Sequence, residues 1–416
     1  MLIAKDERAV FVKKFYINSK TKQINNSCIK LLYYFRCILS FGILFTILLN
    51  IYYIKKRISN LEEIIVKKNS FIQLNYTRNN NNISEELNNN GINNSISSTV
   101  LNKTPINYNY IENGEFNQNI NDKYIELQKY FCDNQTKFYN KNYEERIRLT
   151  EIKFEDKKYT MYAYNKLDFV SNEIIGLKQW ERGCTKRLLA ALNYYSNKKK
   201  IENKDIYIID IGANIGWYSF IFGKYGYKVI AFEPSKLNDY ILRKNYCLNN
   251  EVNVTIINKG LYNEEKICDL YNLYNNEGNG MVICGHNNTL PYFLIKKKTG
   301  EIILTKLSNY ISYLSDKNLA LIKIDVEGSE GKAFEGGIEL ITKYHVPFIF
   351  IEFTPESLRL HGTDPKKFLQ LFVDNGYKLG LFNFFANFTS IDDIMKKNFN
   401  NYNLINIYIV HSKILE

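Results

Sequence analysis

From about residue 150 onward, apolar runs of five to seven residues alternate with amphipathic stretches. This alternation predicts a parallel β-sheet covered by helices, and runs that are apolar at consecutive positions are typical of strands buried on both faces. The longer connection from Leu261 to Leu304 is irregular, with room for short strands at Ile267–Leu270 and Met281–Cys284. We expect the main strands at Ile206–Ile211, Lys228–Phe232, Val254–Asn258, Ala320–Ile324, Pro347–Ile351, Tyr377–Phe382 and Ile405–Val410.

An apolar segment without charges, residues 37–54, stands near the start of the chain. It meets the lower length for a membrane-spanning helix, because about 20 residues cross a hydrocarbon core about 30 Å thick. A cleaved signal peptide fits less well, since a long polar stretch precedes the segment and no small-residue cleavage site follows. We therefore predict a polar tail at 1–36 and a retained single-pass transmembrane helix at 37–54. Basic residues flank both ends, so the orientation stays open.

The segment that follows the apolar run is rich in Asn, Ser and Thr. Its small apolar content cannot offset the entropy of ordering it, so we predict a largely disordered stalk at 55–149 and a folded domain at 150–416. The stalk contains N-x-S/T sequons, which arise by chance in an Asn-rich segment. Further sequons at Asn134, Asn253, Asn287 and Asn387 are candidates for glycosylation if the domain is lumenal.

The net charge of +12 gives little support to nucleic-acid binding. Residues 1–150 hold 21 Lys/Arg and 13 Asp/Glu, a difference of +8, which leaves only +4 for the predicted domain. A nucleic-acid reader usually carries its basic face on the folded domain. We expect no nucleic-acid partner.

The seven cysteines form no C-x-x-C pair, and the four histidines are not spaced as metal ligands on one helix face. An odd number of scattered cysteines makes a zinc site or a dense disulfide framework improbable. The sequence therefore predicts buried free thiols and no metal site built from cysteine or histidine.

The strand expected at Ile206–Ile211 runs into the pattern D-x-G-x-N-x-G, formed by Asp210, Gly212, Asn214 and Gly216. The glycines permit a tight turn and a close approach to the backbone. A nucleotide cofactor binds across such a strand-to-helix turn, at the carboxyl ends of the strands. A dinucleotide site would need G-x-G-x-x-G, and Asn214 and Trp217 occupy two of the positions that require glycine.

Acidic residues follow three of the other expected strands. Glu233 lies 21 residues after Gly212, where an acid at the tip of the second strand accepts hydrogen bonds from a ribose. Asp325 and Glu327 follow the strand Ala320–Ile324, and Glu352 ends the next one. In a doubly wound sheet these tips lie beside that of the first strand, at the topological switch point.

Taken in order, the segments IDIGANIGWYSF, VIAFEPS and LIKIDVEGSE and the strand ending in Ile-Glu resemble the FkbM-type methyltransferase family over about residues 165–385. Leu307-Ser308 stands where that family often has Leu-Asp. The resemblance implies an α/β class I methyltransferase, with a Rossmann-like doubly wound, mostly parallel sheet of seven strands. It also implies S-adenosylmethionine as cofactor and, as acceptor, a hydroxyl of a small molecule, glycan or lipid.

Roles are implied residue by residue. Asp210, Gly212, Asn214 and Gly216 would hold the methionine part of the cofactor, and Glu233 its ribose. Asp325 and Glu327 would face the methyl donor or the acceptor. A hydroxyl acceptor benefits from losing its proton, and our candidate bases are Asp325, Glu327 and Glu352, since a partly buried carboxylate can have a raised pKa. The same acids could bind Mg²⁺, but nothing in the sequence demands a metal.

Two other functions stay open at this stage. An RNA or protein methyltransferase would need a basic face or a target-base motif, and neither is present. A membrane-tethered scaffold that binds the cofactor without catalysis is disfavoured, because Gly212, Gly216, Glu233 and Asp325 are all in place. The sequence does not identify the acceptor or the oligomeric state.

Overall fold

The computed structural model describes residues 118–416 except 166–167, 274–275, 285–296 and 398–403. Its central feature is a seven-stranded sheet in the order β12-β13-β11-β10-β3-β4-β5, in which only β13 runs antiparallel to its neighbours. The chain order reverses between β3 and β10, which creates a topological switch point. The strands are β3 (Ile206–Ile211), β4 (Lys228–Phe232), β5 (Asn253–Ile257), β10 (Asn318–Ile324), β11 (Phe348–Phe353), β12 (Tyr377–Gly380) and β13 (Ile405–His411). The predicted doubly wound, mostly parallel sheet is confirmed.

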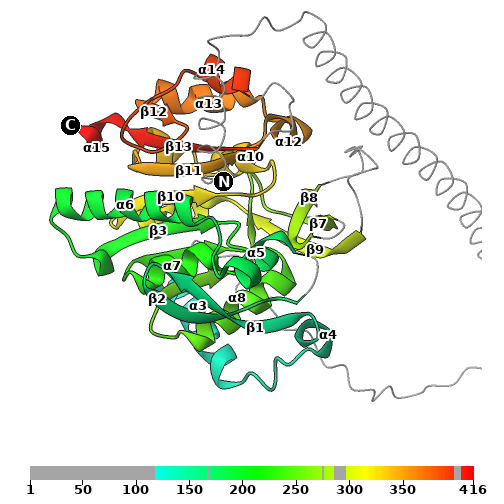
Figure 1. Ribbon diagram of the computed structural model, residues 1–416. Helices are drawn as coiled ribbons and strands as arrows, with labels where there is room; N and C mark the ends of the chain where they lie inside the picture. The colour runs from blue at the N-terminus through cyan, green and yellow to red at the C-terminus, as the bar shows by residue number, and fades with distance from the viewer. Residues whose placement is uncertain (1–117, 166–167, 274–275, 285–296, 398–403) are drawn as a thin grey trace, which may run out of the picture. The chain divides into compact units, whose positions relative to one another are not determined.

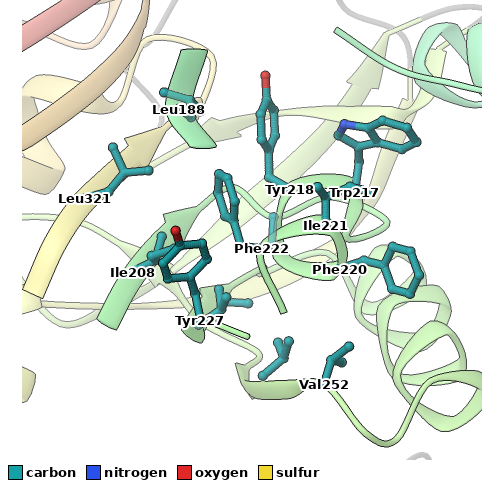
Figure 2. Packing of buried hydrophobic residues seen from close by; sticks show 14 of the residues in the cluster. Leu188, Ile208, Trp217, Tyr218, Phe220, Ile221, Phe222, Tyr227, Val252 and Leu321 are labelled. Atoms are coloured by element: carbon teal, nitrogen blue, oxygen red, sulfur yellow. The ribbon is translucent and has the colours of Figure 1, made fainter. Parts of the chain in front are cut away.

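Helices cover both faces of this sheet (Figure 1). Successive strand residues enter opposite cores: Ile208 packs in the core that contains α7, and Ile209 in the core that contains α13. Figure 2 shows the first of these cores, where Phe222 of α7 lies among the same cluster as Ile208 and Leu321. The helices are α3 (Gln118–Asp133), α4 (Lys141–Glu144), α5 (Phe169–Leu177), α6 (Arg182–Lys199), α7 (Trp217–Lys224), α8 (Lys236–Leu248), α9 (Ile311–Leu314), α10 (Glu330–Glu335), α11 (Glu339–Thr342), α12 (Pro355–Leu360), α13 (Pro365–Asp374), α14 (Ile391–Lys397) and α15 (Ser412–Leu415).

Two smaller sheets accompany the central one. The irregular connection after Leu261 forms a four-stranded sheet in the order β6-β9-β7-β8, and its strands are longer than the sequence predicted. An antiparallel hairpin of β1 and β2 lies between α4 and α5 in the chain. The strands are β1 (Ile147–Phe154), β2 (Lys157–Tyr164), β6 (Gly260–Leu261), β7 (Lys266–Leu273), β8 (Asn276–Ile283) and β9 (Lys297–Thr305).

The folded domain begins before residue 150, which corrects the predicted boundary. Helix α3 lies within the range assigned to the disordered stalk, yet it packs against β5 and α8. The buried side chain of Gln128 donates to the carbonyl of Val254 at 2.6 Å and accepts from the amide of Ile256 at 2.6 Å. An edge strand carries unpaired backbone groups, and Gln128 satisfies two of those of β5.

Four cysteines form disulfides, which corrects the prediction of scattered free thiols. Cys132 of α3 is bonded to Cys247 of α8, and Cys268 of β7 to Cys284 just after β8. Cys184 is a free thiol. Their spacing gave no signal, because the two members of the first pair are 115 residues apart.

The predicted polar tail, transmembrane helix at 37–54 and most of the stalk lie outside the described residues. Within the described part of the chain, no helix is both long and apolar enough to cross a membrane.

Candidate functional site

The turn after β3 is shaped by a close approach between two strand tips. Gly212 has φ +75°, and a Cβ placed there would lie 1.9 Å from the carbonyl oxygen of Asp325 at the tip of β10. The amides of Gly212 and Ala213 both donate to the carbonyl of Phe232 at 3.0 Å. Only glycine leaves room for this arrangement, which holds the tips of β3, β4 and β10 together.

The Glu233 carboxylate is buried at the tip of β4 and orders the loops around it. Oε2 accepts from the amide of Asn214 at 2.8 Å, and Oε1 accepts from the amide of Ser235 at 2.8 Å and from Nδ2 of Asn238 at 3.3 Å. Burial raises its pKa to about 7, although the hydrogen bonds from Ser235, Asn214 and Asn238 oppose the rise. The carboxylate lines a cavity and keeps free acceptor capacity on Oε2.

The four residues of the D-x-G-x-N-x-G pattern have different positions relative to the cavity. Gly212 and Asn214 line the cavity, whereas Asp210 and Gly216 do not. Asp210 is fully buried, and its Oδ2 accepts from the Ser219 hydroxyl at 2.6 Å. Gly216, with φ +94°, begins helix α7. Asp210 and Gly216 therefore contribute to the structure of the turn, while Gly212 and Asn214 line the cavity.

A network missed by the sequence analysis fixes the small sheet over this turn. The amide of Gly278 in β8 donates to Oδ2 of Asp168 at 2.8 Å. The carbonyl of Gly278 accepts from Nδ2 of Asn238 at 2.9 Å and from Nδ2 of Asn214 at 3.4 Å. Asp168 also caps α5 by accepting from the amide of Ser171. These groups lie up to 110 residues apart, so no local motif marked them.

These elements enclose a cavity of about 420 Å³. Its size and its mixture of apolar walls with a few converging polar groups are typical of small-molecule sites. Of the predicted site residues, it is lined by Gly212, Asn214, Glu233, Asp325, Glu327 and Glu352. Apolar walls come from the small sheet, β4, α5 and neighbouring loops: Phe169, Val170, Trp180, Phe232, Leu261, Leu270, Val282, Leu304 and Leu404.

The two tryptophans differ from each other. Trp217 is buried and its Nε1 donates to the hydroxyl of Thr185 at 3.1 Å, as expected for a core residue. Trp180 contacts the core cluster and also lines the cavity. It thus shares the lining of the cavity with Phe169 and Val170.

Three carboxyl groups from the tips of β10 and β11, those of Asp325, Glu327 and Glu352, lie close together in the lining of the cavity. Burial, with the nearby charges of Asp325 and Glu330, raises the pKa of Glu327 to about 8. Burial, with the charges of Asp325, Glu327 and Glu181, raises the pKa of Glu352 to about 10. Oε1 of Glu327 accepts from Nδ2 of Asn279 at 2.5 Å. At neutral pH the carboxyl groups of Glu327 and Glu352 are therefore mostly protonated and uncharged.

One carboxylate oxygen from each of Asp325, Glu327 and Glu352 can be chosen so that the three atoms lie within 4.8 Å of one another. Oxygen ligands at this spacing could hold one hard cation such as Mg²⁺. The sequence analysis found no feature demanding a metal, and the proposal below does not require one.

A buried lysine beneath the carboxylates was also missed by the sequence analysis. The ammonium of Lys323 donates to the carbonyl of Gly212 at 3.0 Å and lies 3.6 Å from both Oδ1 of Asp210 and Oδ2 of Asp325. Burial alone would lower its pKa, but the charges of Asp325 and Asp210 outweigh that effect and raise it. Lys323 thus links the glycine turn to Asp325.

The sheet order, the antiparallel β13 and a cavity at the switch point are those of a class I methyltransferase-type fold. Residues 210–379 match the methyltransferase FkbM domain. The chain therefore carries a methyltransferase FkbM domain, and the resemblance seen in the sequence is confirmed.

Among proteins with curated descriptions, none matches this sequence. Solved structures with a related fold include WbdD, at 9% identity and a TM-score of 0.33, where the alignment covers 55% of this chain and 39% of that one. Another is magnesium protoporphyrin IX methyltransferase (ChlM) from Synechocystis PCC 6803 with bound SAM (11% identity, 70% and 97% coverage, TM-score 0.30). A third is an O-methyltransferase from Bacillus cereus in complex with SAH (12% identity, 53% and 80% coverage, TM-score 0.26). The chain thus spans about two fifths of the length of WbdD, and the assignment rests on the domain match rather than on these similarities.

Proposed function

We propose that this protein is a methyltransferase that uses S-adenosylmethionine and methylates a hydroxyl of a small molecule, glycan or lipid. One observation carries the proposal: the carboxyl group of Glu233 and those of Asp325, Glu327 and Glu352 line the same cavity. A hydrogen-bond acceptor for a ribose hydroxyl and a candidate proton acceptor, Asp325, thereby lie in the same cavity. The predicted helix at 37–54 adds a membrane tether to this proposal.

The residues fit the cofactor in three respects. Gly212 leaves the turn bare of a side chain, Oε2 of Glu233 can accept a further hydrogen bond from a ribose hydroxyl, and Phe232 and Leu261 supply an apolar wall for a flat ring. When bound, S-adenosylmethionine supplies a methyl group on a positively charged sulfur. The Asp325 carboxylate, which lines the same cavity, complements that charge.

The chain's own contribution to the reaction is positioning and proton transfer. Asp325 is the proposed acceptor of the hydroxyl proton, because its carboxylate faces the cavity and is paired with Lys323. Glu352, with its pKa of about 10, carries a proton at neutral pH and can donate a hydrogen bond to the acceptor molecule. Trp180 and Phe169 would exclude water beside them.

The first test is the affinity of the purified protein for S-adenosylhomocysteine, measured by calorimetric titration. We expect Glu233→Ala to weaken binding by at least about tenfold, some 1.4 kcal/mol, since the variant loses the ribose acceptor and the bonds that order Asn214 and Ser235. Glu202→Ala, at an exposed acid before β3, is the control and should bind like wild type. No binding by a wild-type protein that melts cooperatively would sink the methyltransferase proposal.

A second test uses the charge difference between the two forms of the cofactor. The raised pKa values of Glu327 and Glu352 mean that these groups hold protons at neutral pH. A sulfonium beside them favours their ionised forms and so releases protons, whereas the neutral thioether of S-adenosylhomocysteine does not. We expect the ratio of the two Kd values to shift about tenfold in favour of S-adenosylmethionine between pH 6 and pH 9. A ratio independent of pH would contradict placement of the sulfonium beside this group.

A further inference from the structure

Two disulfides join neighbouring elements of the domain, one across 115 residues of the chain and the other across 16. Cys132–Cys247 ties α3 to α8, with the Cα atoms 5.3 Å apart, and Cys268–Cys284 ties β7 to the end of β8, with the Cα atoms 4.7 Å apart. In both cases neighbouring elements are already in contact: α3 packs on α8, and β7 pairs with β8. The four cysteines therefore meet as a consequence of the fold.

Disulfides of this structural kind persist in oxidising compartments and are rare where glutathione and thioredoxin keep thiols reduced. Forming each one removes two protons and two electrons from a pair of thiols. The oxidant is a protein disulfide, which is itself reduced to two thiols by exchange. The compartment that supplies such disulfides in eukaryotic cells, the lumen of the endoplasmic reticulum, is also where N-x-S/T sequons become available for glycosylation.

The described sequons differ in the local structure around their asparagines. Asn134 donates its side-chain amide to the carbonyl of Tyr130 at 3.0 Å. Asn253 is exposed, but it begins strand β5 and its backbone is paired with Lys228 of β4. Asn387, in contrast, is exposed in the loop between β12 and α14 at φ +57°. A glycan acceptor is expected on such a surface loop. The sequon at Asn287 lies outside the described residues.

We propose that this domain matures in an oxidising, glycosylating compartment, where both disulfides form and Asn387 is the site of an N-linked glycan. In that transfer, the bond between the glycan C1 and the oxygen of a lipid diphosphate donor breaks. A bond from C1 to the amide nitrogen of Asn387 forms, and the amide proton leaves with the lipid diphosphate. The glycan does not block the cavity, because none of the residues 381–390 lines it. The inference does not depend on methyl transfer.

The test uses the full chain expressed in eukaryotic cells. Free thiols are alkylated with N-ethylmaleimide at lysis, so that disulfides cannot rearrange afterwards. Peptide mass spectrometry is expected to recover Cys132 linked to Cys247 and Cys268 linked to Cys284, while Cys184 carries the alkyl label. Glycosidase treatment should increase the gel mobility of the wild type. Thr389→Ala should abolish the part of that shift due to Asn387, whereas Thr389→Ser, which preserves the sequon, should keep it. Recovery of the four cysteines as alkylated thiols, or identical shifts for wild type and Thr389→Ala, overturns the proposal.

Discussion

Gly212→Ala is expected to abolish measurable binding of S-adenosylhomocysteine and to destabilise the domain by about 2–4 kcal/mol. Two costs add at this position. The new Cβ would lie 1.9 Å from the carbonyl oxygen of Asp325, and the backbone is held at φ +75°. Because a backbone atom is the obstacle, relief requires the tips of β3 and β10 to separate, and this separation distorts the cavity.

The matched control for this variant is Gly362→Ala. Gly362 has the same φ of +75° but nothing within 4 Å of its Cβ position. The Gly362→Ala variant therefore has only the conformational cost, about 1 kcal/mol, and should bind S-adenosylhomocysteine like wild type. Thermal unfolding and calorimetric titration of both variants separate the two costs. Equal behaviour of the two variants would show that the contact with Asp325 is unimportant.

The second large effect is expected at Asp325. Asp325→Asn should lower kcat by about 10²–10⁴-fold, the range contributed by a positioned proton acceptor, and should change the affinity for S-adenosylhomocysteine much less. Asparagine preserves the size of the side chain but cannot take the proton or balance the charge of Lys323, 3.6 Å away. The measurement is turnover at saturating cofactor with an acceptor found by transfer of a labelled methyl group.

Glu352→Gln provides the comparison. At pH 7 the Glu352 carboxyl is protonated, since its pKa is raised to about 10, and glutamine imitates that neutral form. We expect a loss of less than tenfold in kcat from this variant. If instead Glu352→Gln were the more damaging of the two, the role of proton acceptor would belong to Glu352.

The strands of the central sheet could be predicted because each is a continuous apolar run buried on both faces. Ile206–Ile211 and Lys228–Phe232 agree with β3 and β4 to the residue, and the others differ by a few residues at their ends. The site acids were predictable for a related reason. Parallel strands present their carboxyl ends at one edge, so an acid that follows a strand is placed by the strand itself.

The groups that the sequence did not reveal act across long separations. Lys323 reads as a polar interruption of an apolar strand, and its role depends on the carbonyl of Gly212, 111 residues earlier. Asp168 matters because it accepts from Gly278, 110 residues later. Asp210 was predicted to bind the cofactor, but its burial against Ser219 gives it a supporting position. Such contacts are fixed by tertiary packing and leave no local periodicity.

The contacts of Gln128 with β5 also set a limit on how far the chain can be truncated from its N-terminal side. A fragment starting at residue 150 would lack α3, so the backbone groups of Val254 and Ile256 would lose their partner and Cys247 would keep an unpaired thiol. An uncovered edge strand is a template for pairing with another molecule, and an exposed thiol permits intermolecular crosslinks. Aggregation of that fragment would thus reflect a missing edge cover rather than an unstable catalytic core, and soluble fragments should retain the chain from at least Gln118.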